Sequence, residues 1–226
     1  DMRYAAKDPI SLGSSSFYNP FAGVTEGTLV TPGSYTVELS KVHNGNIEML
    51  SGPVNFTIKA LNNTVLPADS REGKVAFQRE VAELSRKIDG AGRVLNEVNN
   101  KMKHIKEAIK MVEQPLESLL TQYRNTESKI KEIQKEFYGD NIKSRLDIDQ
   151  SVTPSTRIGW INFEQKYSTS SPTETHKMSF NIAKEEFEPI LNMIKQLVKT
   201  DIEKLEQALE DADAPYTPGR ALKMIE

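Results

Sequence analysis

Apolar side chains recur at alternating spacings of four and three residues along one long stretch, and this periodicity constrains the fold more than any other feature. No proline interrupts the chain between Pro67 and Pro115. Alternating spacing of this kind places the side chains on one stripe of a helix, as in a coiled-coil seam. The stripe consists of Phe77, Val81, Leu84, Ile88, Ala91, Leu95, Val98, Met102, Ile105, Ile109 and Val112. We therefore predict a single helix about 60 Å long that buries this stripe against other helices. A D-x-x-E capping box, Asp69–Glu72, predicts its start.

Two later stretches carry matching stripes. Pro115 is suited to the first turn of a second helix, which Gly139 ends, and the spacing from Leu119 to Phe137 repeats the seam. Ser171–Glu174 combines an N-cap, a proline and a capping glutamate, and predicts a third long helix, kinked at Pro189, whose stripe rotates slightly after residue 197. A short extra helix is expected near 154–164. Residues 67–213 are thus predicted to form a three-long-helix antiparallel bundle, followed by an irregular tail at 214–226.

Residues 1–66 have a different character, with many Gly, Pro, Ser, Thr and Asn residues. Alternating patterns predict half-buried strands at 34–39 and 54–58, with an Asn-Gly turn within His43–Asn46 suited to a hairpin between them. Met2–Tyr4 is a candidate third strand. Three strands cannot close a sandwich, so we predict a partial antiparallel β-sandwich whose other strands lie upstream. The fold class expected for the whole chain is α+β.

Composition excludes several classes of function. Lys and Arg total 29 against 32 Asp and Glu, which gives no electrostatic footprint for nucleic acid. The absence of cysteine excludes disulfides and thiolate sites. No apolar run approaches the roughly 20 residues that span a bilayer, so membrane insertion is not expected. The chain begins at Asp1 rather than Met, which fits either a removed leader or a fragment of a longer protein.

No motif in the chain assembles a recognisable active site, and we predict no catalytic residue, metal or cofactor. The three histidines, His43, His104 and His176, are isolated from one another in the sequence. Asp147 and Asp149 lie in an irregular segment, where such a pair more often forms a turn than a metal site. Glycine-rich phosphate loops and nucleophile elbows are absent.

A few aromatic residues are candidates for ligand or interface contacts. Phe17, Tyr18 and Phe21 cluster in a predicted loop. Trp160 could stack on a sugar or anchor the short helix in the core, since its ring buries a large area in either role, and we favour the core position. Tyr216 is predicted to anchor the tail on the bundle.

Three segments together resemble a known family. Asp1–Tyr4, the stretch Gly27–Val37 with its P-G-x-Y-T-V pattern, and the closing Ala214–Arg220, which reads A-P-Y-T-P-G-R, resemble the C-terminal region of secreted bacterial sortilin-like, BNR-repeat (sialidase-like) glycosyl hydrolases. The resemblance covers nearly the whole chain. It implies an immunoglobulin- or fibronectin-like sandwich before the helices and a β-propeller upstream, which would hold any substrate site.

The resemblance therefore implies a non-catalytic accessory region, secreted or periplasmic, that docks or spaces the propeller of the same polypeptide. The propeller's aspartate boxes and arginine cluster have no matching positions here. Two alternatives stay open, a carbohydrate-binding accessory module and a periplasmic helical adaptor. The first would expose two or more aromatic residues on one β-face, and the second would expose or dimerise its helices.

Overall fold

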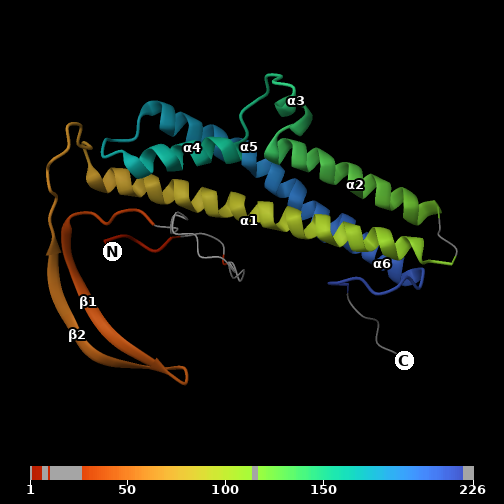
Figure 1. Ribbon diagram of the computed structural model, residues 1–226, viewed down its shortest axis with the longest axis horizontal. Coiled ribbons are helices and arrows are strands. Elements are labelled where there is room, and N and C mark those ends of the chain that lie inside the picture. The colour runs from red at the N-terminus through yellow and green to blue at the C-terminus, as the bar shows by residue number, and fades with distance from the viewer. Residues whose placement is uncertain (1, 7–9, 11–26, 114–116, 221–226) are drawn as a thin grey trace.

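The chain is an α+β protein in which a two-stranded antiparallel sheet stands beside a group of packed helices (Figure 1). The computed structural model describes residues 2–6, 10, 27–113 and 117–220. The strands are β1 (Gly33–His43) and β2 (Asn46–Ile58). The helices are α1 (Arg71–Lys110), α2 (Glu117–Tyr138), α3 (Asn141–Arg145), α4 (Pro154–Tyr167), α5 (Glu174–Gln196), the π-helical segment η1 (Leu197–Ile202) and α6 (Glu203–Asp211).

Helix α1 is the long helix that the periodicity predicts, and it forms the spine of the helical body. Every stripe position from Val81 to Ile109 is buried, while Phe77 and Val112 pack partly exposed at its two ends. Helices α2, α4, α5 and α6 all pack against α1. Figure 1 shows α4 along the N-terminal half of α1 and α2 along its C-terminal half. Each fully buried Leu or Ile side chain of the α1 stripe contributes about 1.5–3 kcal/mol to the free energy of unfolding.

The predicted capping residues of two helices are wrong by one or two positions. Ser70, not Asp69, caps α1, because its hydroxyl accepts from the backbone N–H of Gly73 at 2.9 Å. Asp69 is used elsewhere, since its carboxylate accepts from the Ser171 hydroxyl at 3.0 Å. Thr173 rather than Ser171 caps α5, and His176 rather than a glutamate completes the capping box. The Asp69–Ser171 contact therefore ties the start of α1 to the loop between α4 and α5.

The spacing of the buried residues of α5 changes where the helix becomes π-helical. Ala183, Phe187, Ile190, Ile194 and Leu197 are buried at ordinary helical spacing, and the next buried position, Ile202, comes five residues after Leu197. A π-helical turn holds more residues than an α-helical turn, so η1 absorbs this extra residue and keeps Leu205 and Leu209 on the same face. The slight rotation predicted from the sequence is therefore a local π-helical segment, and Pro189 lies inside α5.

The helix end predicted at Gly139 and the helix start predicted at Thr153 and Pro154 are confirmed, whereas Pro115 lies outside the described residues and Pro172 precedes the N-cap of α5. Helix α2 ends at Tyr138, and Gly139 follows with φ of 85°, a left-handed conformation that favours glycine. Asp140 then caps α3 by accepting from the N–H groups of Ile142 and Lys143. The extra helix near 154–164 is α4, with Thr153 as its N-cap and Pro154 in its first turn.

Strands β1 and β2 form the predicted hairpin, which we call the hairpin arm (Gly33–Ile58). Its turn residues Asn44 and Gly45 have φ of 51° and 78°, as a type I′ turn requires. The prediction that these strands are half-buried is wrong, because nearly every side chain of the arm is exposed and the described residues contain no second sheet to cover it. The predicted strand at Met2–Tyr4 is reduced to an isolated bridge between Arg3 and Leu29.

Candidate functional site

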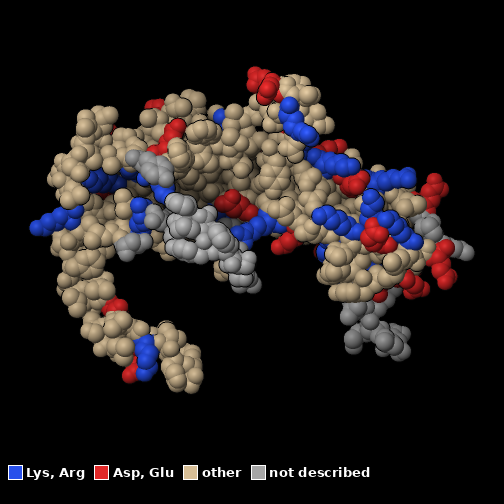
Figure 2. All heavy atoms as spheres, in the orientation of Figure 1, with Lys and Arg blue, Asp and Glu red and all other residues tan. Residues whose placement is uncertain are grey.

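The hairpin arm carries the largest group of exposed apolar side chains among the described residues. Tyr35 and Phe56 pair across the strands with ring centroids 6.0 Å apart, and the next pair on that face is Val37 with Val54. Near the tip, a Lys41–Glu48 ion pair of 3.1 Å spans the strands. The exposed apolar side chains of the arm are Val37, Leu39, Val42, Ile47, Met49, Leu50, Val54 and Phe56. Figure 2 shows the arm curving away from the helices with few charged side chains on this face.

Among the described residues, no strand lies beside the outer edges of the arm. Each strand pairs only with the other in the sheet that the structure describes. The register shifts between Val37 and Leu39 and again between Leu39 and Ser40, which is the signature of bulges. Exposed edges of this kind present unpaired N–H and C=O groups that another strand can join. The arm is therefore suited to contact a folded partner through its faces and through its edges.

Trp160 lies on the surface, so the prediction that it anchors α4 in the core is wrong. Its side chain is 60% exposed, and Phe163, one turn further on, is 59% exposed. The two rings meet edge to face with centroids 6.2 Å apart. Ile158 and Ile161 supply the buried face of α4 instead, and Trp160 falls on the opposite side of the helix. Together with Thr156 and Gly159, the two aromatic side chains line a shallow hollow.

Tyr216 is also exposed, at 56%, and does not anchor the tail as predicted. The anchors are its neighbours Thr217, which is 2% exposed, and Arg220. The Arg220 guanidinium donates to the carbonyl of Ala214 at 2.8 Å, and its Nε lies 2.9 Å from Oε2 of Glu210. The A-P-Y-T-P-G-R segment thus acts here as a structural clamp. Phe17, Tyr18 and Phe21 lie outside the described residues.

The titratable groups singled out in the sequence do not come together. His104 is exposed on α1. His176 serves the cap of α5, with Nδ1 accepting from the N–H of Thr173 at 3.2 Å and Nε2 lying 2.5 Å from Oε2 of Glu164. Asp147 adopts φ of 51° in a turn. No group of three or more His, Asp or Glu side chains suited to a metal ion occurs within the part of the chain that is described. In that same part, none of the helices combines the length and the apolar character needed to cross a bilayer.

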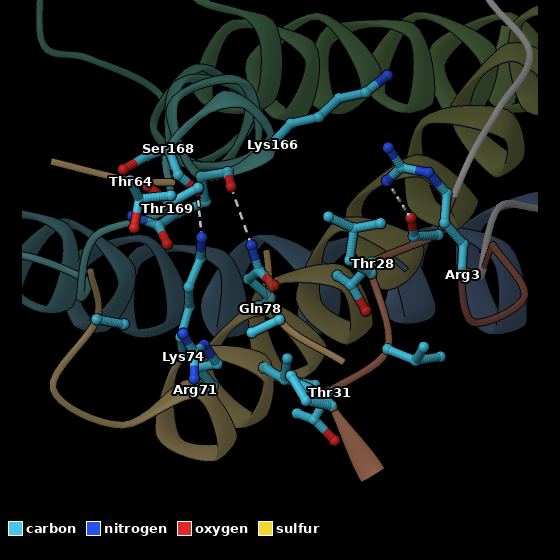
Figure 3. A pocket seen from close by; sticks show the side chains of 18 of the residues that line it. Arg3, Thr28, Thr31, Thr64, Arg71, Lys74, Gln78, Lys166, Ser168 and Thr169 are labelled. Carbon is cyan, nitrogen blue, oxygen red and sulfur yellow. Dashed lines mark hydrogen bonds between the residues drawn. The ribbon is translucent and has the colours of Figure 1, made fainter. Parts of the chain in front are cut away.

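A cavity that the sequence did not reveal lies where the N-terminal segment, the 60–68 connection, the start of α1 and the end of α4 meet. It has a volume of about 510 Å³. Lys74 donates to the carbonyl of Ser168, and the Gln78 amide donates to the carbonyl of Gln165 at 2.9 Å (Figure 3). Arg3 donates to the carbonyl of Gly27 at 3.1 Å. The first two bonds join α1 to the end of α4, and the third joins residue 3 to residue 27; we call the space between these segments the basic cavity.

One feature of the sequence signals the basic cavity. Arg71 and Lys74 stand in the first turn of α1, where cations oppose the helix dipole. The other walls come from residues distant in sequence, and their meeting depends on tertiary structure.

Comparison of the chain with protein-family models, with curated protein sequences and with solved structures finds no match. The fold itself defines the chain as an α+β protein with a long helical spine and an exposed hairpin arm. The resemblance to sortilin-like glycosyl hydrolases remains a hypothesis from the sequence.

Proposed function

We propose that the chain is a non-catalytic accessory region that docks, through its hairpin arm, on a neighbouring folded domain. The observation that carries this proposal is the exposure of the arm, with apolar side chains on its surface and, in the part of the chain that the structure describes, no strand beside either edge. A lone two-stranded ribbon is at best marginally stable in water, and an uncovered apolar edge promotes aggregation. Contact with a folded partner would relieve both problems.

The partner we propose is a β-propeller upstream in the same polypeptide, as the family resemblance implies. In this proposal the arm belongs to an immunoglobulin- or fibronectin-like sandwich that further strands complete, and α1, α2 and α5 form the antiparallel bundle predicted from their stripes. The bundle would act as a spacer, because α1 alone is about 60 Å long. Substrate chemistry would belong to the propeller, and the whole protein would act outside the cytoplasm of a bacterium.

The experiment compares this chain with the same chain extended upstream in its natural polypeptide. Amide hydrogen exchange in β1 and β2 is expected to slow in the extended protein, because docking covers these amides. Replacing Val37 and Val54 by Lys should restore fast exchange there without changing the helical signal. Val65→Lys is the matched control, since Val65 is exposed but lies outside the arm. Equal exchange of the arm in both proteins would refute docking.

The same pair of proteins tests the non-catalytic part of the proposal. On one panel of aryl-glycosides and glycans, we expect only the extended protein to act or bind. Hydrolysis by the present chain alone would contradict the accessory role.

A carbohydrate-binding module is the second candidate, and the exposed Trp160–Phe163 pair favours it. Exposed aromatic rings can stack on sugars, although these two rings meet edge to face on a helix and not side by side on a sheet. Glycan binding that Trp160→Ala abolishes would support this candidate. The helical adaptor has less support, because the α1 seam is buried within the chain.

A further inference from the structure

The basic cavity has the size of a ligand site. Its volume of about 510 Å³ falls within the roughly 300–1,000 Å³ usual for small-molecule pockets. Helix α1 supplies one wall with Lys74, Val75 and Gln78, and the end of α4 supplies another with Ser168 and Thr169. The stacking of Arg79 over the Tyr4 ring, at 4.0 Å, holds the N-terminal segment against α1. The space is therefore built by packing and does not depend on a single loop.

Positive charge dominates the lining of the cavity. Arg3, Arg71, Lys74 and Lys166 contribute to it, and none of the lining residues that the structure describes is an Asp or a Glu. Arg71 and Lys74 stand three residues apart at the start of α1. In Figure 3 the Lys74 amine points toward Ser168, while the Lys166 amine points away from it. Arg71 and Lys74 donate to neutral groups, the Oδ1 of Asn62 at 2.9 Å and the carbonyl of Ser168. The nearby carboxylates of Asp69 and Glu72 accept from Ser171 and Ser70.

Two further effects make the charge of Arg71 and Lys74 costly unless an anion is present. The N-terminus of α1 carries the positive end of the helix dipole, so Arg71 and Lys74 are placed against it. Partial burial also lowers the pKa of Lys74 below its ordinary value, because desolvation penalises the ammonium form. An anion in the cavity would offset both effects.

The rest of the lining matches a small polyhydroxylated molecule. The lining combines side chains that can form hydrogen bonds with aliphatic surface from Leu29, Val30 and Val75. Gln165 is 3% exposed, and its Oε1 has no hydrogen-bond partner. The polar lining residues other than the cations are Thr28, Thr31, Asn62, Asn63, Thr64, Gln78, Ser85, Asn162, Gln165, Ser168 and Thr169. Hydroxyls and amides suit the hydroxyl groups of a sugar, and aliphatic groups suit its ring.

We infer that the basic cavity binds a sugar-sized organic anion, with the acid group held by Arg71 and Lys74 at the start of α1. The acid group is a carboxylate or a phosphate, because either one carries the negative charge that the two cations would bind. No residue of the hairpin arm lines this binding site, so the inference does not depend on the proposed docking.

Calorimetric titration of the full chain tests the inference with four probes, which are glucuronate, glucose 6-phosphate, glucose and inorganic phosphate. At least one sugar acid should bind, and its affinity should exceed that of glucose and of inorganic phosphate. The double variant Arg71→Gln/Lys74→Gln should bind it about tenfold more weakly or worse. Lys131→Gln, which removes an exposed cation on α2, should leave binding unchanged. Raising NaCl from about 50 to about 500 mM should weaken binding, as expected for contact between charges.

A second readout separates binding from any effect of the variants on folding. In the unmodified chain, the side-chain amide signals of Gln78 and Gln165 should shift on addition of the sugar acid, and those of Gln207, on the distant α6, should not. Which of the two acids binds more tightly identifies the acid group. Failure of both acids to bind would overturn the inference. If glucose bound as tightly as the sugar acids, the proposed role of the cations would be wrong. If inorganic phosphate bound as tightly as the sugar acids, the proposal that the ligand is sugar-sized would be wrong.

Discussion

Replacing Arg220 by Met is expected to destabilise the protein although Arg220 lies in an irregular tail. Its side chain is 6% exposed and that of its partner Glu210 is 19% exposed. The change removes the ion pair with Glu210 and the hydrogen bond to the Ala214 carbonyl. It keeps a long apolar side chain in place, so the main loss is electrostatic and not a cavity.

The size of the loss follows from the burial and geometry of the pair. Removing one partner of a fully buried ion pair costs about 3–5 kcal/mol. Glu210 retains some contact with water, and the Nε and Nη1 atoms of Arg220 make no hydrogen bond of good geometry despite the 2.9 Å approach. Both facts place the loss nearer to about 2–3 kcal/mol. For a chain of this length, that corresponds to a fall in Tm of about 4–12 °C.

Urea unfolding followed by far-ultraviolet circular dichroism measures this loss, and a double-mutant cycle assigns it to the pair. Glu210→Gln alone should also destabilise, because it leaves the guanidinium buried without a counter-ion. The double variant should lose less than the sum of the two single losses. Lys177→Met, which breaks an exposed pair with Glu174, should leave the midpoint unchanged. A midpoint for Arg220→Met equal to that of the parent protein would refute the clamp.

Two further predictions concern local structure. Deleting Lys199 from η1 should change the free energy of unfolding by less than about 1 kcal/mol, because the segment can return to an α-helix that keeps Leu197 and the later stripe residues on one face. Deleting Lys184 from α5 instead turns the rest of the stripe by about 100° and should prevent stable folding. Urea titrations of both variants check this, and equal effects would contradict it. The pKa of Asp140 is lowered, chiefly because its carboxylate accepts from the backbone N–H of Lys143. The charged carboxylate therefore stabilises the fold at pH values above the ordinary aspartate pKa. This stabilisation is lost as the pH falls through the lowered pKa of the folded protein. Asp140→Asn should therefore reduce the urea midpoint at about pH 6 and have no effect in strong acid, and a difference that persists in acid would exclude the charge as its cause.

The helical part of the fold could be predicted because its signals are local. A 4-3 stripe determines which face of α1 is buried whatever covers it, and Gly139 marks a helix end by its backbone freedom alone. The caps were wrong where polar neighbours compete, since Ser70 and Asp69 can both accept from the first turn. Tertiary contact with Ser171 takes Asp69 away from the helix.

The candidate site was less predictable, because burial on a short helix is decided by its neighbours. Helix α4 carries apolar residues on two faces, and nothing in its own sequence says that Ile158 turns inward and Trp160 outward. Similarly, the sequence predicts Tyr216 and not Arg220 as the anchor of the tail, because an arginine is seldom as buried as this one. The basic cavity needed four distant segments to meet, and only the cations in the first turn of α1 hinted at it.

The position of α1 near the middle of the chain has a consequence for synthesis on the ribosome. Its whole apolar stripe leaves the ribosome before the last helices that cover it, which end at Asp211. At about 5–20 residues per second, roughly 100 further residues take about 5–20 s. During that interval the stripe can pair with the same stripe of another nascent chain, because it has the spacing of a coiled-coil seam. Chains truncated before α5 are therefore expected to self-associate, and nascent chains should recruit chaperones until α6 is complete.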